Sequence, residues 1–195
     1  MLRKKLYVAY GSNLNKTQMK YRCPNAEFVG TGTLKGYELQ FKGARNYAYA
    51  TIAPRPDSEV PVGVWKITPE DERNLNRYEG YPTHYFKQNI PVQMENGETV
   101  RAMVYIMDLK QEFGMPSASY YNTVYAGYLD CDLDTDFLDD AIEQNRLKVK
   151  SYGYSESYYS SAGYSMNFFD GEADDSNTTD LNDDDEDYSE GMKLT

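Results

Sequence analysis

The chain offers few histidine and cysteine residues, and this narrows the reactions it can catalyse. It contains one histidine, His84, and two widely separated cysteines, Cys23 and Cys131. One histidine cannot form a multi-histidine metal site, and the cysteines lack the close spacing of zinc ligands. Reduced thiols are therefore expected, and the remaining candidates for chemistry are a polar loop and a carboxylate.

The polar loop is Gly11-Ser12-Asn13, which directly follows an apolar, β-prone run from Leu6 to Tyr10. A buried strand that ends in this way delivers a tight loop to one place. Glycine permits close approach of a ligand, and bare backbone N–H groups and short polar side chains can bind an anion. The same pattern is typical of an ordinary strand-ending turn, so both interpretations are open.

The carboxylate is Glu79, at the end of a predicted helix. Thr68-Pro69 followed by acidic residues is typical of a helix start, and Gly80 ends the helix near residue 78 or 79. Because Leu75 and Glu79 are four residues apart, the carboxylate follows the apolar stripe inward. Half-buried at the negative end of a helix, Glu79 is expected to have a raised pKa, which suits proton transfer near neutral pH. The alternative is a solvent-facing glutamate at a frayed helix end.

A series of strands must position these groups. Segments 27–34, 37–42, 47–53 and 60–67 are rich in β-branched and aromatic residues and predict four strands joined by short turns. Glycines at positions 30, 32 and 36 indicate bulges or tight corners, as in a sheet that curls on itself. Segments 85–92 and 99–107 predict a hairpin across Asn96-Gly97.

Two helices are predicted to complete the fold. One opens at Pro116-Ser117 and carries a tyrosine stripe, and the other is amphipathic and spans residues 133–150. Acidic residues near the start of the second helix match part of a calcium-binding loop. Phe137 stands where that loop needs glycine for its turn, so no metal site is predicted.

The charge of the chain is concentrated in its last 45 residues. They hold 12 of the 31 acidic residues and one of the 20 basic ones, so residues 1–150 are balanced and the net charge of −11 belongs to residues 151–195. We expect a folded domain over 1–150 and a disordered tail, rich first in Tyr, Ser and Gly and then in Asp, over 151–195. No apolar run approaches the length of a membrane span.

Three separated motifs resemble those of the γ-glutamylcyclotransferase superfamily. They are the loop Tyr10–Leu14, the helix end Leu75–Pro82 with Tyr85 after it, and Pro116–Tyr120. Segments 50–52 and 62–65 are similar to the middle strands of that family. The resemblance covers roughly residues 6 to 142 and leaves residues 151–195 without a counterpart.

The resemblance implies an α+β fold, a small mixed β-barrel with flanking helices, and a reaction that needs no cofactor. The α-amine of a γ-glutamyl group attacks its own γ-carbonyl, which yields 5-oxoproline and releases an amine or amino acid. Glu79 matches the acid/base residue of the family. The implied substrate-binding residues are Tyr10, Gly11, Ser12, Asn13, Leu14, Tyr85 and Tyr120.

Two positions depart from the family pattern. The spacing from the glutamate varies among relatives, so Phe86 is an alternative to Tyr85. Asn76 stands where many relatives have Asp, which affects the support of the helix end and not the reaction itself.

The sequence thus predicts a cytoplasmic enzyme, a monomer or homodimer, with a small γ-glutamyl substrate and with neither nucleic acid nor membrane as a partner. A protein partner for the acidic tail is a further expectation. The alternative is a module that binds a small metabolite without catalysis and whose tail engages a basic partner.

Overall fold

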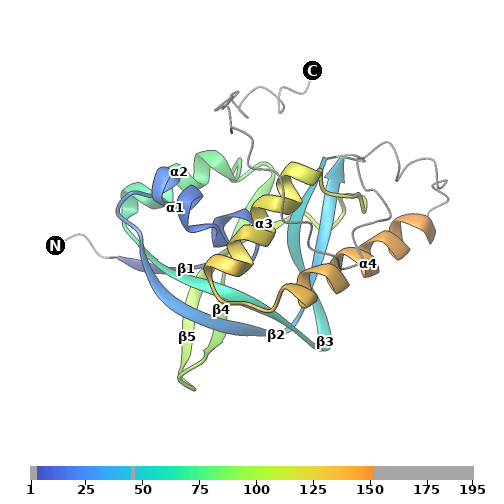
Figure 1. Ribbon diagram of the computed structural model, residues 1–195. Coiled ribbons are helices and arrows are strands. Elements are labelled where there is room, and N and C mark those ends of the chain that lie inside the picture. Colours follow the sequence, from blue (N-terminus) through green and yellow to red (C-terminus); the bar gives the residue numbers. More distant parts are fainter. Residues whose placement is uncertain (1–3, 45–46, 152–195) are drawn as a thin grey trace, which may run out of the picture. The chain divides into compact units, whose positions relative to one another are not determined.

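Five strands close into a barrel in the computed structural model, which describes residues 4–44 and 47–151 (Figure 1). The strands follow the order β1-β3-β2-β4-β5 around the barrel. β1 pairs with β5 in parallel at Tyr7 and Met103, and the other neighbours are antiparallel. This mixed barrel with flanking helices confirms the expected fold class. The bounds are β1 Lys5–Ala9, β2 Glu27–Ala44, β3 Tyr47–Ile67, β4 Tyr85–Met94 and β5 Thr99–Met107.

Two long strands replace the four short ones expected between residues 27 and 67. β2 and β3 pair along almost their whole length, and the register shifts between Phe28 and Gly30 and between Lys35 and Tyr37. A bulge bends a strand without ending its ladder, so the predicted bulges at Gly30 and Gly36 are confirmed, whereas Gly32 pairs in register. The predicted breaks at residues 35–36 and 54–59 are wrong, and the break between residues 42 and 47 is confirmed, since β2 ends at Ala44 and β3 begins at Tyr47. Gly36 adopts a φ of +79°, which favours glycine.

Closure of the barrel depends on a close approach at Gly32. This residue lies opposite Met94 where β2 pairs with β4. A Cβ added to Gly32 would lie 2.7 Å from the backbone oxygen of Gln93. Only glycine fits this junction without displacing the backbone of β4.

Helices cover the barrel at two places (Figure 1). α1 and α2 lie next to each other, and α3 packs against both α4 and the short 3₁₀ helix η1 that follows β1. The predicted helix starts are confirmed: Thr68 caps α2, and Ser117 caps α3. The bounds are η1 Ser12–Leu14, α1 Lys16–Arg22, α2 Pro69–Tyr78, α3 Ala118–Asp130 and α4 Thr135–Ser151.

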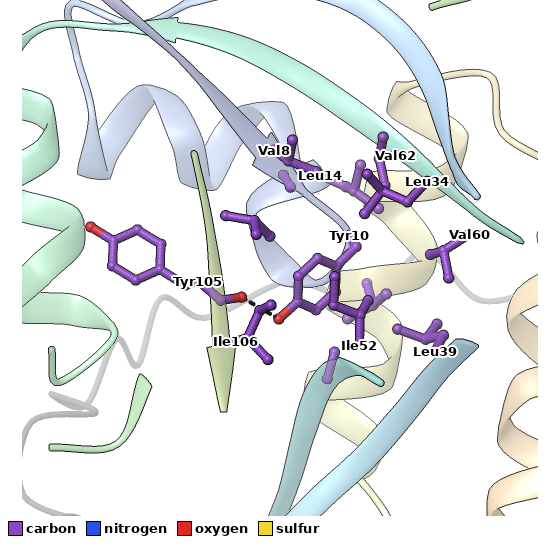
Figure 2. Close-up of a cluster of buried hydrophobic side chains, with 14 of the residues drawn as sticks. Val8, Tyr10, Leu14, Leu34, Leu39, Ile52, Val60, Val62, Tyr105 and Ile106 are labelled. Carbon is purple, nitrogen blue, oxygen red and sulfur yellow. Dashed lines mark hydrogen bonds between the residues drawn. The ribbon is translucent and has the colours of Figure 1, made fainter. Parts of the chain in front are cut away.

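The core fills the inside of the barrel. Figure 2 shows the ring of Tyr10 among aliphatic side chains that include Val8, Ile52 and Ile106. The Tyr10 hydroxyl donates to the backbone oxygen of Tyr105 at 2.6 Å. The side chain of Tyr105 itself points away from this cluster, because successive residues of a strand face opposite sides of a sheet.

One prediction falls almost wholly outside the described residues. The acidic tail predicted over 151–195 lies outside them except for Ser151, the last residue of α4. Among the helices of residues 4–44 and 47–151, none is long and apolar enough to cross a membrane.

Candidate active site

The end of α2 delivers Glu79 to the loop after β1. Thr68 and Asp71 form a capping box that fixes the start of α2, and Leu75 is fully buried beneath it. The backbone N–H of Glu79 donates to the Leu75 oxygen at 2.8 Å, so Glu79 is held on the last turn. Its side chain is half-buried and accepts a hydrogen bond from Asn13, 2.9 Å from Nδ2 to Oε1. The alternative of a solvent-facing glutamate is therefore wrong.

Burial controls the acidity of Glu79. It raises the pKa of the carboxyl from 4.5 to about 7, while the charge of Arg22 and the hydrogen bond from Asn13 act in the opposite direction. The direction expected from the sequence is confirmed, with desolvation as the first cause. A carboxyl with this pKa is present in both ionisation states at neutral pH and can both take and return a proton.

The loop after β1 forms the other side of the site. The first hydrogen bond of η1 runs from Leu14 N–H to the Gly11 oxygen at 2.9 Å, so the N–H groups that precede Leu14 have no partner within this short helix. The Asn13 amide reaches Glu79 with one N–H and the Tyr7 hydroxyl with the other, at 2.8 Å. Asn13 thus joins the loop, the first strand and the carboxylate.

Arg22, the last residue of α1, completes this network. Its Nη1 donates to Asn13 Oδ1 at 2.7 Å and to Ser12 Oγ at 3.2 Å, and its Nη2 donates to the Tyr78 hydroxyl at 2.6 Å. Arg22 is not among the site residues predicted from the sequence. The hydrogen bonds join residues 9 and 10 positions apart in the sequence, and no local pattern of the sequence indicates them.

Two phenols flank Gly11 through a single residue of β3, Ala50. The Tyr85 hydroxyl donates to the Ala50 oxygen at 3.0 Å, and the Ala50 N–H donates to the Tyr120 hydroxyl oxygen at 3.2 Å. A Cβ added to Gly11 would lie 3.1 Å from the Tyr120 hydroxyl. Phe86 is exposed and points away from this cluster, so the structure places Tyr85 and not Phe86 beside the loop.

The tyrosines of the site are neutral in this environment. Burial, followed by the charge of Glu79, raises the pKa of the Tyr7 and Tyr10 hydroxyls well above 10, and burial is also the largest cause of the raised pKa of Tyr85 and Tyr120. Neutral phenols donate or accept hydrogen bonds and do not act as bases near pH 7. Glu79 is therefore the group of this cluster suited to proton transfer.

The prediction that Leu14 binds the substrate is wrong. Its side chain is fully buried in the core, where Gly63 and Gly127 leave room for it. A Cβ on Gly127 would lie 2.7 Å from that of Leu14. Leu14 therefore anchors the loop to the barrel and to α3 and does not line the site. Apolar side chains of strand-ending loops often turn into the core, because burial of a leucine contributes about 2 kcal/mol.

The part of the chain that the structure describes contains no group of three His, Cys, Asp or Glu residues suited to a metal ion. The acidic residues near the start of α4 serve the helix instead, with Asp134 Oδ1 accepting from the Asp136 N–H at 3.0 Å.

Known proteins resemble this chain in sequence and in fold. Residues 7–122 match the profile of the family described as gamma-glutamyl cyclotransferase, AIG2-like. Mouse gamma-glutamylcyclotransferase is 29% identical over 155 residues, which cover 74% of this chain and 82% of that protein. The human protein of the same name is 28% identical over 130 residues, 63% of this chain and 69% of that protein.

A solved structure named gamma-glutamyl cyclotransferase superposes with a TM-score of 0.63 at 24% identity, and the superposition covers 83% of this chain and 99% of that one. This likeness supports the fold. Since the family profile spans more than half of the sequence and includes the loop, Glu79 and Tyr120, the chain belongs to the gamma-glutamyl cyclotransferase, AIG2-like family.

Proposed function

We propose that this protein is a γ-glutamyl cyclotransferase with Glu79 as its general base and then its general acid. The observation that carries the proposal is a half-buried carboxyl with a pKa of about 7, hydrogen-bonded to the loop that follows β1. The substrate is a γ-glutamyl amine or a γ-glutamyl amino acid, as the family membership suggests.

The proposed reaction moves two protons from the attacking nitrogen to the leaving nitrogen. The ionised carboxylate of Glu79 removes a proton from the substrate α-ammonium, and the free amine attacks the γ-carbonyl carbon to form a C–N bond. The tetrahedral intermediate then expels the leaving amine as its C–N bond breaks, and Glu79 returns the proton to that nitrogen. The ring nitrogen gives up its second proton, which passes through Glu79 to the released amine. The products are therefore 5-oxoproline and the protonated amine, and Glu79 is again ionised.

Asn13 prepares the carboxylate for this role. It donates to Oε1 of Glu79, and within the described residues Oε2 accepts no hydrogen bond. Oε2 is therefore the oxygen proposed to meet the substrate amine. Because ring closure is intramolecular, the remaining task of the site is to hold the glutamyl group curled with its amine near its own carbonyl.

The loop and Tyr120 are proposed to hold the glutamyl group. The backbone N–H groups of Gly11, Ser12 and Asn13 can stabilise a carboxylate or a developing oxyanion. The Tyr120 hydroxyl accepts from the Ala50 N–H, so its own proton is free to donate to the substrate. Tyr10 and Tyr85 use their hydroxyl protons on backbone oxygens, which makes their rings walls of the site.

A panel of γ-glutamyl compounds tests the proposal. Glutathione, γ-glutamyl-lysine and several γ-glutamyl amino acids are incubated with the full chain, and 5-oxoproline is measured by mass spectrometry. We expect product from at least one compound and a loss of at least about 1,000-fold in Glu79→Gln, since the general base and acid are the same group.

Glu70→Gln is the matched control, because Glu70 lies exposed in the first turn of the same helix. It should retain wild-type activity. If no compound yields 5-oxoproline, or if Glu79→Gln is fully active, the proposal is wrong. A γ-glutamyl compound that co-purifies with the protein and stays unchanged would instead favour the non-catalytic binding module.

A further inference from the structure

We propose that Arg22 is a positioning residue of this site, which holds the Asn13 side-chain amide in the orientation that donates to Glu79. The inference rests on the proposed function, because it gives Arg22 a part in preparing the general base. It concerns a residue outside the three motifs and adds a third element, α1, to the machinery that surrounds Glu79.

The orientation of the Asn13 amide follows from the hydrogen-bonding capacity of its neighbours. A guanidinium can only donate, and an ionised carboxylate can only accept. Arg22 Nη1 lies 2.7 Å from Asn13 Oδ1, and Glu79 Oε1 lies 2.9 Å from Asn13 Nδ2. A flipped amide would direct its NH₂ group at the guanidinium and its oxygen at the carboxylate, so both contacts would become repulsive.

The other hydrogen-bond partners of the Asn13 amide do not fix its orientation. The Tyr7 hydroxyl, which lies 2.8 Å from Nδ2, can either donate or accept and is compatible with both orientations. A protonated Glu79 can also do both. Arg22 is the partner whose donor-only character excludes the flipped amide in each ionisation state of Glu79.

Arg22 is itself fixed to the helix that carries Glu79. Its guanidinium carbon lies 3.6 Å from the centroid of the Tyr78 ring, and Nη2 donates to the Tyr78 hydroxyl. Its backbone oxygen accepts from Asn74 Nδ2 at 3.1 Å. Tyr78 and Asn74 both belong to α2, so these contacts fix the position of Arg22 relative to the helix that carries Glu79.

Arg22 also supplies a positive charge that stabilises the ionised carboxylate of Glu79. Phenols and one thiol on the other elements interact electrostatically with Glu79, and all of them have raised pKa values and stay neutral near pH 7. They are Tyr7, Tyr10, Cys23, Tyr85, Tyr105 and Tyr120. Among the described residues, Arg22 is the cation that stabilises the ionised form of Glu79.

The test compares Arg22→Gln with Arg22→Lys and with Lys20→Gln. Glutamine removes the charge and can both donate and accept, so it no longer specifies the amide orientation. Lysine restores a donor-only cation. Lys20 lies exposed in the same last turn of α1, and Lys20→Gln removes an equal charge without touching Asn13.

Two readouts are followed from pH 5 to 9: kcat for 5-oxoproline formation and the ¹³C chemical shift of the Glu79 carboxyl. We expect Arg22→Gln to move both midpoints upward by about one pH unit, which is the size expected for the loss of one nearby opposite charge. At pH 6 this lowers the ionised fraction, and with it kcat, about tenfold. Arg22→Lys should return both midpoints close to the wild-type value, and Lys20→Gln should leave them unchanged.

A lower kcat in Arg22→Gln with an unshifted Glu79 midpoint would reduce Arg22 to a structural residue and overturn the inference. If the wild type forms no 5-oxoproline, the proposed function fails, while the carboxyl titration still decides whether Arg22 acts on Glu79.

A wild-type measurement covers the case in which Arg22→Gln does not fold. The two Asn13 Nδ2 protons should titrate together with Glu79, and the Arg22 Nη groups should show slow rotation. A guanidinium that rotates freely would overturn the inference.

Discussion

Glu79→Gln is expected to remove activity and, at neutral and alkaline pH, to stabilise the fold. Glutamine keeps the shape of the side chain and an oxygen that can accept from Asn13 Nδ2. It removes a charge that the half-buried site does not favour. Function and stability therefore make opposite demands on this position.

The magnitude follows from the pKa of Glu79, which is about 7 in the folded protein and 4.5 ordinarily. Because the folded state holds the proton more tightly than the unfolded state, the wild type loses stability as the pH rises from about 4.5 to 7. Each unit of pKa difference corresponds to about 1.4 kcal/mol, so the free energy of unfolding falls by about 3 kcal/mol, and this loss is complete above pH 7. Glu79→Gln avoids this loss, so its advantage is near zero at pH 4 and about 3 kcal/mol at pH 8.

Urea denaturation of the wild type and of Glu79→Gln at pH 4, 6 and 8 measures this difference. The acidic residues at 151–195 are common to both proteins and cancel in the comparison. Glu70→Gln removes the charge of an exposed glutamate from the same helix and serves as the control. It should differ from the wild type by less than about 0.5 kcal/mol at each pH.

A stability gain of equal size at pH 4 and pH 8 would refute the reasoning. It would mean that glutamine packs better for reasons unrelated to ionisation, and that burial does not perturb the Glu79 carboxyl. A gain that grows with pH in Glu70→Gln as well would assign the effect to the net charge of the domain.

Four further outcomes are expected. The kcat/KM of the wild type should rise with pH through a midpoint near 7, because Glu79 must be ionised to act as the base; a pH profile without a midpoint between 6 and 8 would contradict this role. Tyr120→Phe removes the hydroxyl beside the loop and should lower kcat/KM about 10- to 100-fold, measured by 5-oxoproline release. Tyr128→Phe, which removes a buried hydroxyl without a hydrogen-bond partner in the described residues, should leave kcat/KM unchanged and stability equal or higher. Gly32→Ala should destabilise the barrel by about 1 to 3 kcal/mol in urea denaturation, because its Cβ would lie 2.7 Å from the Gln93 oxygen; an alanine variant as stable as the wild type would show that β4 can move aside.

Local signals in the sequence predicted the elements that position Glu79. The Thr68 cap with Pro69 and the acidic first turn specify the start of α2, and they act within four residues of one another. The Asn96-Gly97 turn likewise acts locally and joins β4 to β5. For the same reason the inward face of Glu79 could be predicted, because helical periodicity relates it directly to Leu75.

Long-range contacts could not be predicted in this way. The parallel contact of β1 with β5 at Tyr7 and Met103 joins segments far apart in the sequence, and no local pattern encodes it. The continuity of β2 through Gly36 could not be predicted, because a glycine between two β-prone runs is typical of both a bulge and a turn. The burial of Leu14 depends on α3, whose Gly127 allows the close approach.

The contact between α1 and α2 explains how Glu79 can be held firmly in a position where burial disfavours its charge. Asp71, fully buried at the start of α2, accepts from the Thr68 N–H at 2.9 Å and from the Asn25 N–H at 3.3 Å, so it ties α2 to the segment after α1. The end of α1 places Arg22 at the far end of α2, where the Asn74 side chain donates to its backbone oxygen and the Tyr78 hydroxyl accepts from its guanidinium. Hydrogen bonds at both ends of α2 therefore fix Glu79 in surroundings that disfavour its charge. A carboxyl that was free to move would turn toward water and regain an ordinary pKa, so the value of about 7 requires this fixed frame.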